Sequence, residues 1–262
     1  MLCCSYVHAS ELTFYTYHDT PPYYFSSKTQ AIAAAERSSR QDSEPTLQVG
    51  LYQALINLIN EAQQQWRIKL QYMPRKRVNL LLQSNQLQGA LIGVNPIWFK
   101  DKQQTRYLWS PPFLWDTDIV VVRKGLSVNY QHPNDLIGLN LAIPRGYYFW
   151  GVADNLKSGS QQAIKTSSEL QNLKLLAAGR ADATILSQLT LKYYENTVFQ
   201  PNTFNAMTTP HDQYSRAILF PQKYSGAFAE LENIVAEVVN SDAWQDLLRT
   251  KHQEHATPDA AL

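Results

Sequence analysis

The sequence predicts an α/β fold made of two similar units, and three observations support this prediction. Segments typical of strands alternate with segments typical of helices along most of the chain. One layout, in which a helix is followed by a turn, a polar step and a buried strand, occurs in RVNLLLQSNQLQGALIG and again in ELQNLKLLAAGRADATIL. The 262 residues are enough for one or two domains with a sizeable core. Such alternation is typical of parallel sheets with crossover helices.

In the first half of the chain, hydrophobic periodicity predicts strands and helices in turn. Strands are expected over residues 12–17, 67–72, 89–94 and 119–123, which are rich in β-branched, aromatic or other apolar residues. A helix is expected after Gly50, because one helical face holds Leu51, Leu55, Leu58, Ile59 and Ala62. A second helix is expected over 75–84. The polar stretch 26–45 has no periodicity and is expected to be an exposed insertion.

The second half repeats the alternation. Strands are expected over residues 139–143, 163–166, 183–186 and 215–219. The helix expected over 168–178 has Ser167 or Ser168 as its N-cap and Gly179 as its C-cap. A final helix is expected from one apolar face, which holds Leu231, Ile234, Val235 and Val238.

The composition excludes two classes of protein. Lys and Arg number 23 and Asp and Glu number 22, so the formal net charge is only +1, whereas nucleic-acid binding depends on a basic face. No apolar run approaches the roughly 20 residues that a membrane-spanning helix needs. The low glycine content, 10 residues, also disfavours glycine-rich phosphate-binding loops.

The first nine residues resemble the end of an export signal. Val7 and Ala9 occupy the small-residue positions of a cleavage site, so we expect 1–9 to be a signal-peptide remnant and the protein to be periplasmic. A frayed cytosolic terminus is the alternative. Both cysteines, Cys3 and Cys4, lie in this segment, and cleavage after Ala9 would leave none for a disulfide, a nucleophile or a metal site.

Five short motifs occur in a fixed order between residues 12 and about 251. They are PPYYF at 21–25, Gly50-Leu51 at the start of the first helix, YLWSPPF at 107–113, LAAGRADA at 176–183 and SDAWQDLL at 241–248. In this order they resemble the extracellular solute-binding proteins of family 3, the periplasmic receptors associated with uptake of polar amino acids.

The resemblance implies a two-lobed, periplasmic-binding-protein-like (type II) α/β fold with parallel or mixed sheets, crossover helices and a central cleft. Lobe 1 would comprise 10–123 and 214–262, and lobe 2 would comprise 124–213, with hinges near 123–125 and 210–214. Ligands of such folds sit beyond the carboxyl ends of strands and are enclosed by hinge closure. The resemblance therefore implies a monomeric receptor that takes a small polar or anionic solute to an ABC-type permease. A ligand sensor for a membrane signalling protein is the alternative partner class.

Departures from the family pattern predict the chemistry of the solute. The family's carboxylate-binding arginine is absent from residues 95–102, where only Lys100 or Lys102 could substitute. Ser187 stands where relatives have the acid that binds the ligand's amino group. Arg75 replaces an aromatic stacker, and Arg145 stands in a turn that donates to the carboxylate in relatives. These exchanges indicate an anionic or neutral, partly aromatic-stacked solute.

The expected ligand-binding residues lie at strand ends and in the substituted segments. They are Tyr23, Tyr24, Arg75, Arg77, Asn95, Trp98, Lys100, Arg145, Tyr147, Tyr148 and Ser187. Alternatives stay open, because 75–77 could be a solvated helix start and the tyrosines at 147 and 148 could be core or hinge packing.

No pattern of a catalytic site stands out. The motifs G-x-S-x-G, H-E-x-x-H and G-x-x-x-x-G-K-[ST] do not occur, and the six histidines are scattered. We therefore expect no catalytic residues, no metal and no cofactor. A cleft dehydratase for prephenate-like acids shares the fold and is the enzyme alternative, although it needs a carboxylate acid/base that the sequence does not place.

Overall fold

A computed structural model describes residues 9–27, 29–31, 49–200 and 202–253. The chain divides into two compact units. The first comprises Met1–Asp19, Gln48–Leu114 and Ser215–Gln253, and the second comprises Thr20–Leu47, Trp115–Tyr214 and Glu254–Leu262. The expected signal-peptide remnant, apart from Ala9, and most of the expected insertion at 26–45 lie outside the described residues.

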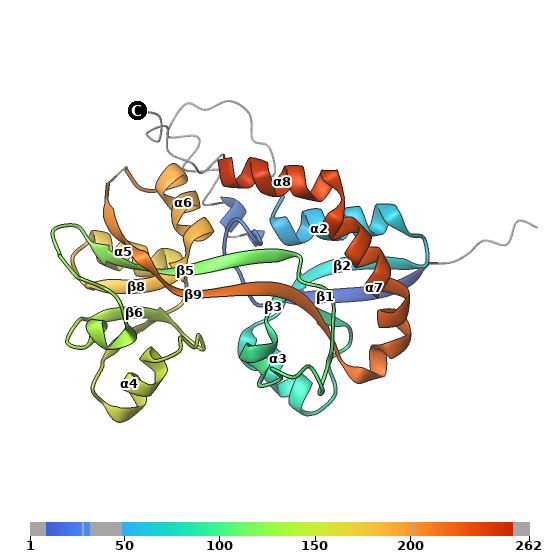
Figure 1. Ribbon diagram of the computed structural model, residues 1–262, viewed down its shortest axis with the longest axis horizontal. Coiled ribbons are helices and arrows are strands. Elements are labelled where there is room, and N and C mark those ends of the chain that lie inside the picture. The colour runs from blue at the N-terminus through green and yellow to red at the C-terminus, as the bar shows by residue number, and fades with distance from the viewer. Residues whose placement is uncertain (1–8, 28, 32–48, 201, 254–262) are drawn as a thin grey trace, which may run out of the picture. The chain divides into compact units, whose positions relative to one another are not determined.

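The first unit is built on a mixed sheet in the order β2-β1-β3-β9, with β4 also paired to β9. Its strands are β1 (Ser10–Thr16), β2 (Trp66–Tyr72), β3 (Ala90–Val94), β4 (Leu108–Trp109) and the end of β9 (Phe204–Phe220). Strand β1 runs parallel to β2 and β3, whereas β9 runs antiparallel to β3. The carboxyl ends of β1 and β3 therefore meet at one edge of the sheet, where β9 passes in the opposite direction (Figure 1).

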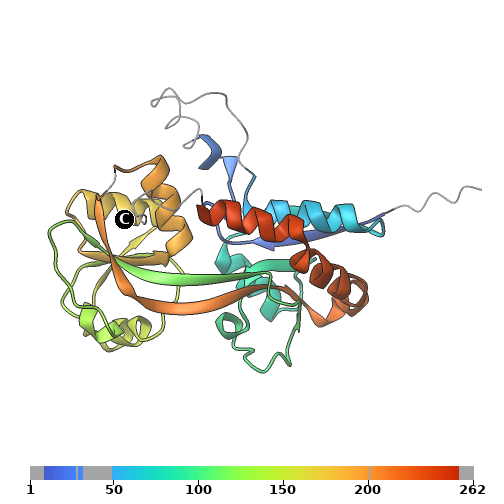
Figure 2. The ribbon, with the colours of Figure 1, turned by 45° about the horizontal axis from the view of Figure 1, so that its top comes forward.

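Helices cover both faces of this sheet. They are α2 (Leu51–Ala62), α3 (Arg75–Gln83), α7 (Ser225–Asn240) and α8 (Asp242–Gln253), with short 3-10 turns η1 (Pro96–Phe99) and η3 (Gln222–Tyr224). Helix α2 packs against β2 and α7, and Figure 2 shows α2 beside α8. Trp244 of α8 is completely buried, and its indole N–H donates to the carbonyl of Phe113 at 2.9 Å.

The second unit has the strand order β9-β5-β8-β6-β7. Its own strands are β5 (Leu114–Arg123), β6 (Leu141–Pro144), β7 (Ala163–Thr166) and β8 (Ala183–Ser187). Strand β6 is parallel to β7 and β8, and β5 is antiparallel to β8. The helices are α4 (Val152–Ser158), α5 (Glu169–Ala177), α6 (Gln188–Thr197) and the 3-10 turn η2 (Pro133–Leu136). Ser168 caps α5 by accepting from the Gln171 N–H, as expected from the sequence.

The structure confirms the expected α/β class with mixed sheets, and it extends two strands. Strand β5 begins at Leu114 rather than 119, and β9 begins at Phe204 rather than 215. Both added stretches carry polar side chains, and the one in β9 includes Pro210, so neither shows the apolar pattern of a strand. Helices α4 and α6 were not expected from periodicity.

The division into units differs from the expected lobe boundaries at 123 and 214. The chain passes between the units at Leu114/Trp115 and at Tyr214/Ser215, and 20–47 belongs to the second unit. Residues 118–122 group with that unit because they pair with β8. Tyr23 groups with it because its hydroxyl bonds to Asp116 and Ser187.

Candidate functional site

A cluster of cations and aromatic rings lies at the carboxyl edge of the first sheet, and we call it the Arg75 cluster. His18 follows β1, Trp98 follows β3, and Arg216 enters on β9, where Ala217 pairs with Val94. The other members are Tyr17, Tyr52, Arg75 and Phe99. Ligands of α/β folds are usually bound beyond the carboxyl ends of strands.

The backbone at Gly93 brings Tyr52 and Arg216 together. Gly93 has a φ of 81° and lies where the register of β3 against β9 shifts. A Cβ atom there would lie 2.2 Å from the Tyr52 hydroxyl oxygen, so only glycine lets the tyrosine ring approach. Arg216 Nη1 donates to the Gly93 carbonyl at 3.1 Å and to Tyr52 Oη at 3.2 Å.

His18 is a buried, uncharged member of this cluster. Its Nδ1 lies 3.5 Å from Tyr52 Oη, and its Nε2 lies 3.4 Å from Arg216 Nη1. Burial is the main cause that holds its pKa well below 6.5, and the positive charges of Arg216 and Arg75 act in the same direction. The imidazole is therefore neutral at pH 7.

The short turn η1 supplies one wall of the cluster. Asn95 caps it, since its Oδ1 accepts from the Ile97 N–H at 3.0 Å while its Nδ2 donates to the Ser215 carbonyl at 2.9 Å. Lys100 ends the turn in the left-handed conformation (φ 55°), and its side chain is exposed. Among the site residues expected from sequence, Asn95 therefore has a structural role and Lys100 lies at the surface.

Asp101 holds the loop that follows η1. Its buried carboxylate accepts hydrogen bonds from the backbone N–H groups of 105–107, at 2.9 to 3.1 Å, and from the Trp109 indole at 2.8 Å. Burial alone would raise the pKa of Asp101, but these donors outweigh it and hold the pKa below its ordinary value. The loop behind Trp98 and Phe99 is thus tied to a fixed charge.

Arg75 is the cation of the cluster that the sequence singled out. Its Cζ lies over the ring of Tyr17 at 4.4 Å and over that of Phe99 at 4.3 Å. Its Nη2 donates to the carbonyl of Trp98 at 3.0 Å, and its Nε donates to Asn79 Oδ1 at 3.0 Å. The side chain is half-buried, and it forms no ion pair with an acidic side chain within the part of the chain that the structure describes.

Trp98 contacts both arginines. Its carbonyl accepts from Arg75, and its half-buried ring lies 5.6 Å from the Cζ of Arg216. Arg77, two residues further along α3 than Arg75, is exposed. Of the first-unit residues expected from sequence, the structure brings together Arg75 and Trp98.

A second polar cluster lies within the second unit, around Asp116. Tyr23 Oη lies 2.5 Å from Asp116 Oδ2 and 2.5 Å from Ser187 Oγ, and Ser187 Oγ donates to Asp116 Oδ1 at 2.9 Å. Tyr214 Oη donates to Asp118 at 2.8 Å. Tyr23 is 1% exposed and Ser187 4%, so both expected site residues are buried side chains that contact a carboxylate. Ser187 also caps α6.

The remaining expected residues lie on loops of the second unit. Arg145 and Tyr148 are exposed after β6, whereas Tyr147 is half-buried and packs against Phe149. Tyr24 is half-buried. These positions place two candidate side chains at a surface and do not gather them into one site.

Sequence reasoning missed a buried histidine in the same region. His211 is 3% exposed, bonds through Nδ1 to Tyr130 Oη at 2.6 Å, and stacks on Trp150 at 5.5 Å. Burial lowers its pKa from 6.5 to about 4. The Trp150 indole donates to the His211 carbonyl at 2.8 Å, so this ring pair is fixed to the backbone of β9. His211 lies in the part of β9, before residue 215, that the sequence did not identify as a strand.

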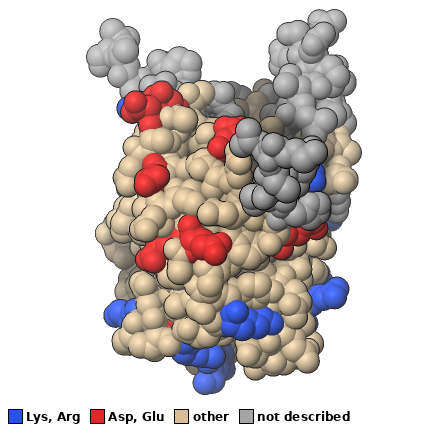
Figure 3. Space-filling model, turned by 90° about the vertical axis from the view of Figure 1, so that its right-hand side faces the viewer, with Lys and Arg blue, Asp and Glu red and all other residues tan. Residues whose placement is uncertain are grey.

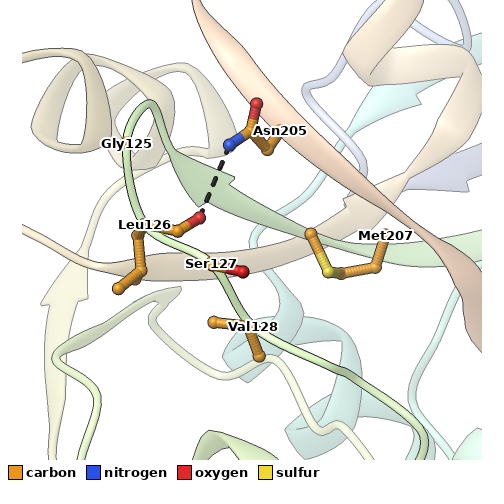
Figure 4. Close-up of a pocket in the computed structure, with 6 residues that line it drawn as sticks. All are labelled: Gly125, Leu126, Ser127, Val128, Asn205 and Met207. Atoms are coloured by element: carbon orange, nitrogen blue, oxygen red, sulfur yellow. Dashed lines mark hydrogen bonds between the residues drawn. The ribbon is translucent and has the colours of Figure 1, made fainter.

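A shallow pocket lies next to the turn after β5. It is lined by Gly125, Leu126, Ser127, Val128, Asn205 and Met207. Figure 4 shows Asn205 Nδ2 donating to the Leu126 carbonyl, at 3.4 Å, across this pocket. Its lining carries no charged side chain, so any anion there would be held by neutral donors alone.

Three further observations concern the surface and the described helices and titratable groups. On the face shown in Figure 3, Lys and Arg side chains form separate groups rather than one continuous basic surface. No helix in the described part of the chain is long and apolar enough to cross a membrane. Among the described residues, no group of three or more His, Cys, Asp or Glu could hold a metal ion.

Comparison with known proteins supports the fold at low sequence identity. No protein-family model and no curated protein sequence matches the chain. A mutant of ArgBP from T. maritima has a TM-score of 0.69 and 15% identity, over 93% of this chain and 96% of that one. The amino acid ABC transporter substrate-binding protein AbpA from Streptococcus pneumoniae, bound to L-arginine, has a TM-score of 0.68 and 14% identity, over 95% and 97%.

A third similar structure concerns the molecular basis of glutathione import in Gram-positive bacteria, via GshT and the cystine ABC importer TcyBC of Streptococcus mutans. Its TM-score is 0.71 and its identity 16%, over 96% of this chain and 98% of that one. The matches run almost from end to end in both directions, so the likeness concerns the whole architecture. The chain has the α/β fold of the periplasmic binding proteins, as the sequence predicted.

Proposed function

We propose that the protein is a periplasmic solute-binding receptor of the family 3 type that delivers a small polar or anionic solute to an ABC-type permease. The fold supports this proposal, because similar structures include substrate-binding proteins of ABC transporters. The five ordered sequence motifs support the same family. We further propose that the receptor acts as a monomer and binds its solute without chemical change.

The observation that carries the proposal is Arg75 in its aromatic surroundings. A half-buried guanidinium with no acidic partner among the described side chains lies at the strand edge where this fold class binds ligands. Arginine in such a setting suits carboxylates and other oxyanions, because it presents a planar fork of donors.

Ser187 does not by itself decide which charge the second unit offers to a solute. Ser187 replaces an acid of the family pattern, but its hydroxyl donates to the buried carboxylate of Asp116. The second unit therefore does hold a carboxyl group at this place, contributed by β5 rather than by Ser187 at the end of β8. The case for an anionic solute consequently rests on the first unit and its Arg75 cluster.

A thermal-shift screen of the purified chain tests the proposal. Amino acids, organic acids, oligosaccharides and short peptides are added one at a time, and unfolding is followed by intrinsic fluorescence. A true solute at about 100 times its Kd stabilises the folded state by about 2.7 kcal/mol, which raises the midpoint by several degrees. If no compound of any class raises the midpoint, the proposed receptor function is wrong.

The same samples separate a receptor from the cleft enzyme. After overnight incubation with stoichiometric protein, a receptor returns its solute chemically unchanged, as seen by NMR of the supernatant after denaturation. Conversion of prephenate or a similar acid under these conditions would favour the dehydratase alternative.

A further inference from the structure

We propose that Arg75 binds a flat carboxylate of the solute edge-on, in the plane of its guanidinium group, and that the two rings beside it compete with a stacked ligand there. This inference rests on the proposed function, because it names the chemical class that the same site recognises. It also selects one arginine from the three, Arg75, Arg77 and Arg145, that the sequence left as candidates.

Two aromatic rings lie against the guanidinium, since the Cζ of Arg75 lies 4.4 Å from the centre of the Tyr17 ring and 4.3 Å from that of Phe99. Rings this close to Cζ already make the cation–π contacts of the group, so they compete with an aromatic ring of a solute that would stack on it. The rings also remove water and fix the orientation of the group, which lowers the entropy lost on binding.

Two of the guanidinium nitrogens already have partners, because Nε donates to Asn79 Oδ1 and Nη2 donates to the Trp98 carbonyl. The N–H groups left for a ligand lie at the end of the guanidinium, where one of Nη1 and one of Nη2 point the same way. The Tyr17 hydroxyl is a further hydrogen-bond neighbour of Arg75. Two parallel N–H donors in one plane match the two oxygens of a carboxylate. A lysine at this position could offer only a point charge.

The charge of Arg75 acts on its surroundings, because no acidic side chain pairs with it in the described ranges. His18 nearby is neutral mainly because burial lowers its pKa, and the positive charges of Arg216 and Arg75 lower it further. A bound anion would offset this field, whereas a neutral or cationic group would gain nothing from it.

The test uses small probes on the full chain: acetate, neutral acetamide and inorganic phosphate, at constant ionic strength. The readout is the arginine Nε–H signal of Arg75 in a ¹H–¹⁵N NMR spectrum, assigned by its loss in Arg75→Lys. We expect acetate to shift this signal saturably, acetamide to leave it unmoved, and phosphate to bind more weakly than acetate. Backbone amides near Trp98 should report at least a tenfold weaker acetate affinity in Arg75→Lys.

Arg67→Lys is the matched control, because Arg67 is an exposed arginine of the same unit, and it should bind acetate like the wild type. If Arg75→Lys does not fold, Arg75→Gln and the acetate–phosphate comparison on the wild type decide the matter. An unmoved Arg75 signal, undiminished acetate binding by Arg75→Lys, or tighter phosphate binding overturns this inference. In those cases a solute found in the thermal-shift screen still upholds the receptor function, which fails only if the screen itself is empty.

Discussion

Two buried carboxylates, Asp101 and Asp116, show how single residues set the two polar clusters. Asp101 gathers three backbone N–H groups and one indole, so it shapes a loop. Asp116 gathers side-chain hydroxyls, so it ties Tyr23 to β5 and β8. In both cases several donors offset the cost of burying a charge, and removing either side of the interaction leaves buried polar groups unpaired.

Asp101→Asn should lower the free energy of unfolding by about 2–3 kcal/mol, because hydrogen bonds to a charged group are lost and the amide NH₂ would face N–H donors. Urea unfolding at pH 7 measures the change. Glu61→Gln, the same exchange at an exposed site of this unit, should change stability by less than about 0.5 kcal/mol. Equal effects of the two variants would mean that Asp101 does not anchor the loop.

Tyr23→Phe should lower the free energy of unfolding by about 1–3 kcal/mol, since Asp116 and Ser187 lose a hydroxyl partner in a buried place. Its affinity for a solute found in the screen should match that of the wild type. Tyr148→Phe removes the hydroxyl of a residue that is 65% exposed and should leave stability unchanged. A stable Tyr23→Phe protein with weakened solute binding would show that Tyr23 contacts the solute, as the sequence suggested.

The sequence could single out Arg75, but it could not reveal Arg216 or Asp116. Arg75 opens a helix that periodicity identifies, and its neighbour Trp98 follows a strand of apolar residues. Arg216 is one charge in an apolar stretch, SRAILF, and this pattern is the only sequence signal that it is buried. The hydroxyl partners of Asp116 are Tyr23, Ser187 and Tyr214, which come from three distant segments, and only the folded chain brings them together.

At the scale of elements, the bulge in β3 controls how the Arg75 cluster is assembled. Gly93 lets Tyr52 of α2 reach Arg216 of β9, and the following residues turn into η1. Its positive φ of 81° also occurs at Gly125, where an added Cβ would meet nothing within 4 Å. Variants at these two positions therefore distinguish the cost of a positive φ from the cost of a collision with the Tyr52 ring.

Gly125→Ala should cost about 1–2 kcal/mol of stability, which is the cost of the left-handed conformation alone. Gly93→Ala should lower stability by about 1–3 kcal/mol more than Gly125→Ala does, because its Cβ would overlap the Tyr52 ring. Thermal unfolding of the two variants measures the difference, and calorimetry should show weaker solute binding only for Gly93→Ala. Equal midpoints for the two variants would contradict the close approach of Tyr52.

Most elements follow from periodicity, and the longest exception, the first part of β9, has a cause that the structure shows. The strands that are apolar on both faces, β3 and β8, were expected within one residue of their ends. The first eleven residues of β9 alternate weakly and are mostly exposed or half-buried, so local pattern does not distinguish them from a loop. Their extended form depends on a partner strand, β5, that ends at Arg123, whereas β9 begins only at Phe204.

At the scale of the whole molecule, the described part of each unit contains one buried neutral histidine, His18 in the first and His211 in the second. Burial lowers both pKa values, that of His211 from 6.5 to about 4. Between pH 6.5 and the lowered pKa, each histidine is protonated in the unfolded chain but not in the folded chain. Stability is therefore complete above pH 6.5 and falls as the pH is lowered toward 4.

His211 alone should account for a loss of roughly 3 kcal/mol across this window, from the difference in its two pKa values. His211→Gln removes the titrating group, so its stability should fall less steeply between pH 6.5 and 4.5 than that of the wild type. Urea midpoints at five pH values give the two slopes. Parallel slopes would mean that His211 is protonated at the same pH in the folded and unfolded chains.

The hydrogen bond from the Phe113 N–H to the Arg216 carbonyl, at 2.9 Å, has a consequence for gene architecture. The chain leaves the first unit after Leu114 and re-enters it at Ser215, and each of these residues is next to one of the two that the bond joins. Codons 115–214 therefore form a cassette inside the coding sequence of the first unit, with the segment 20–47 as a separate addition. Recombination at these two points can exchange the cassette between related genes and leave every codon of the Arg75 cluster untouched.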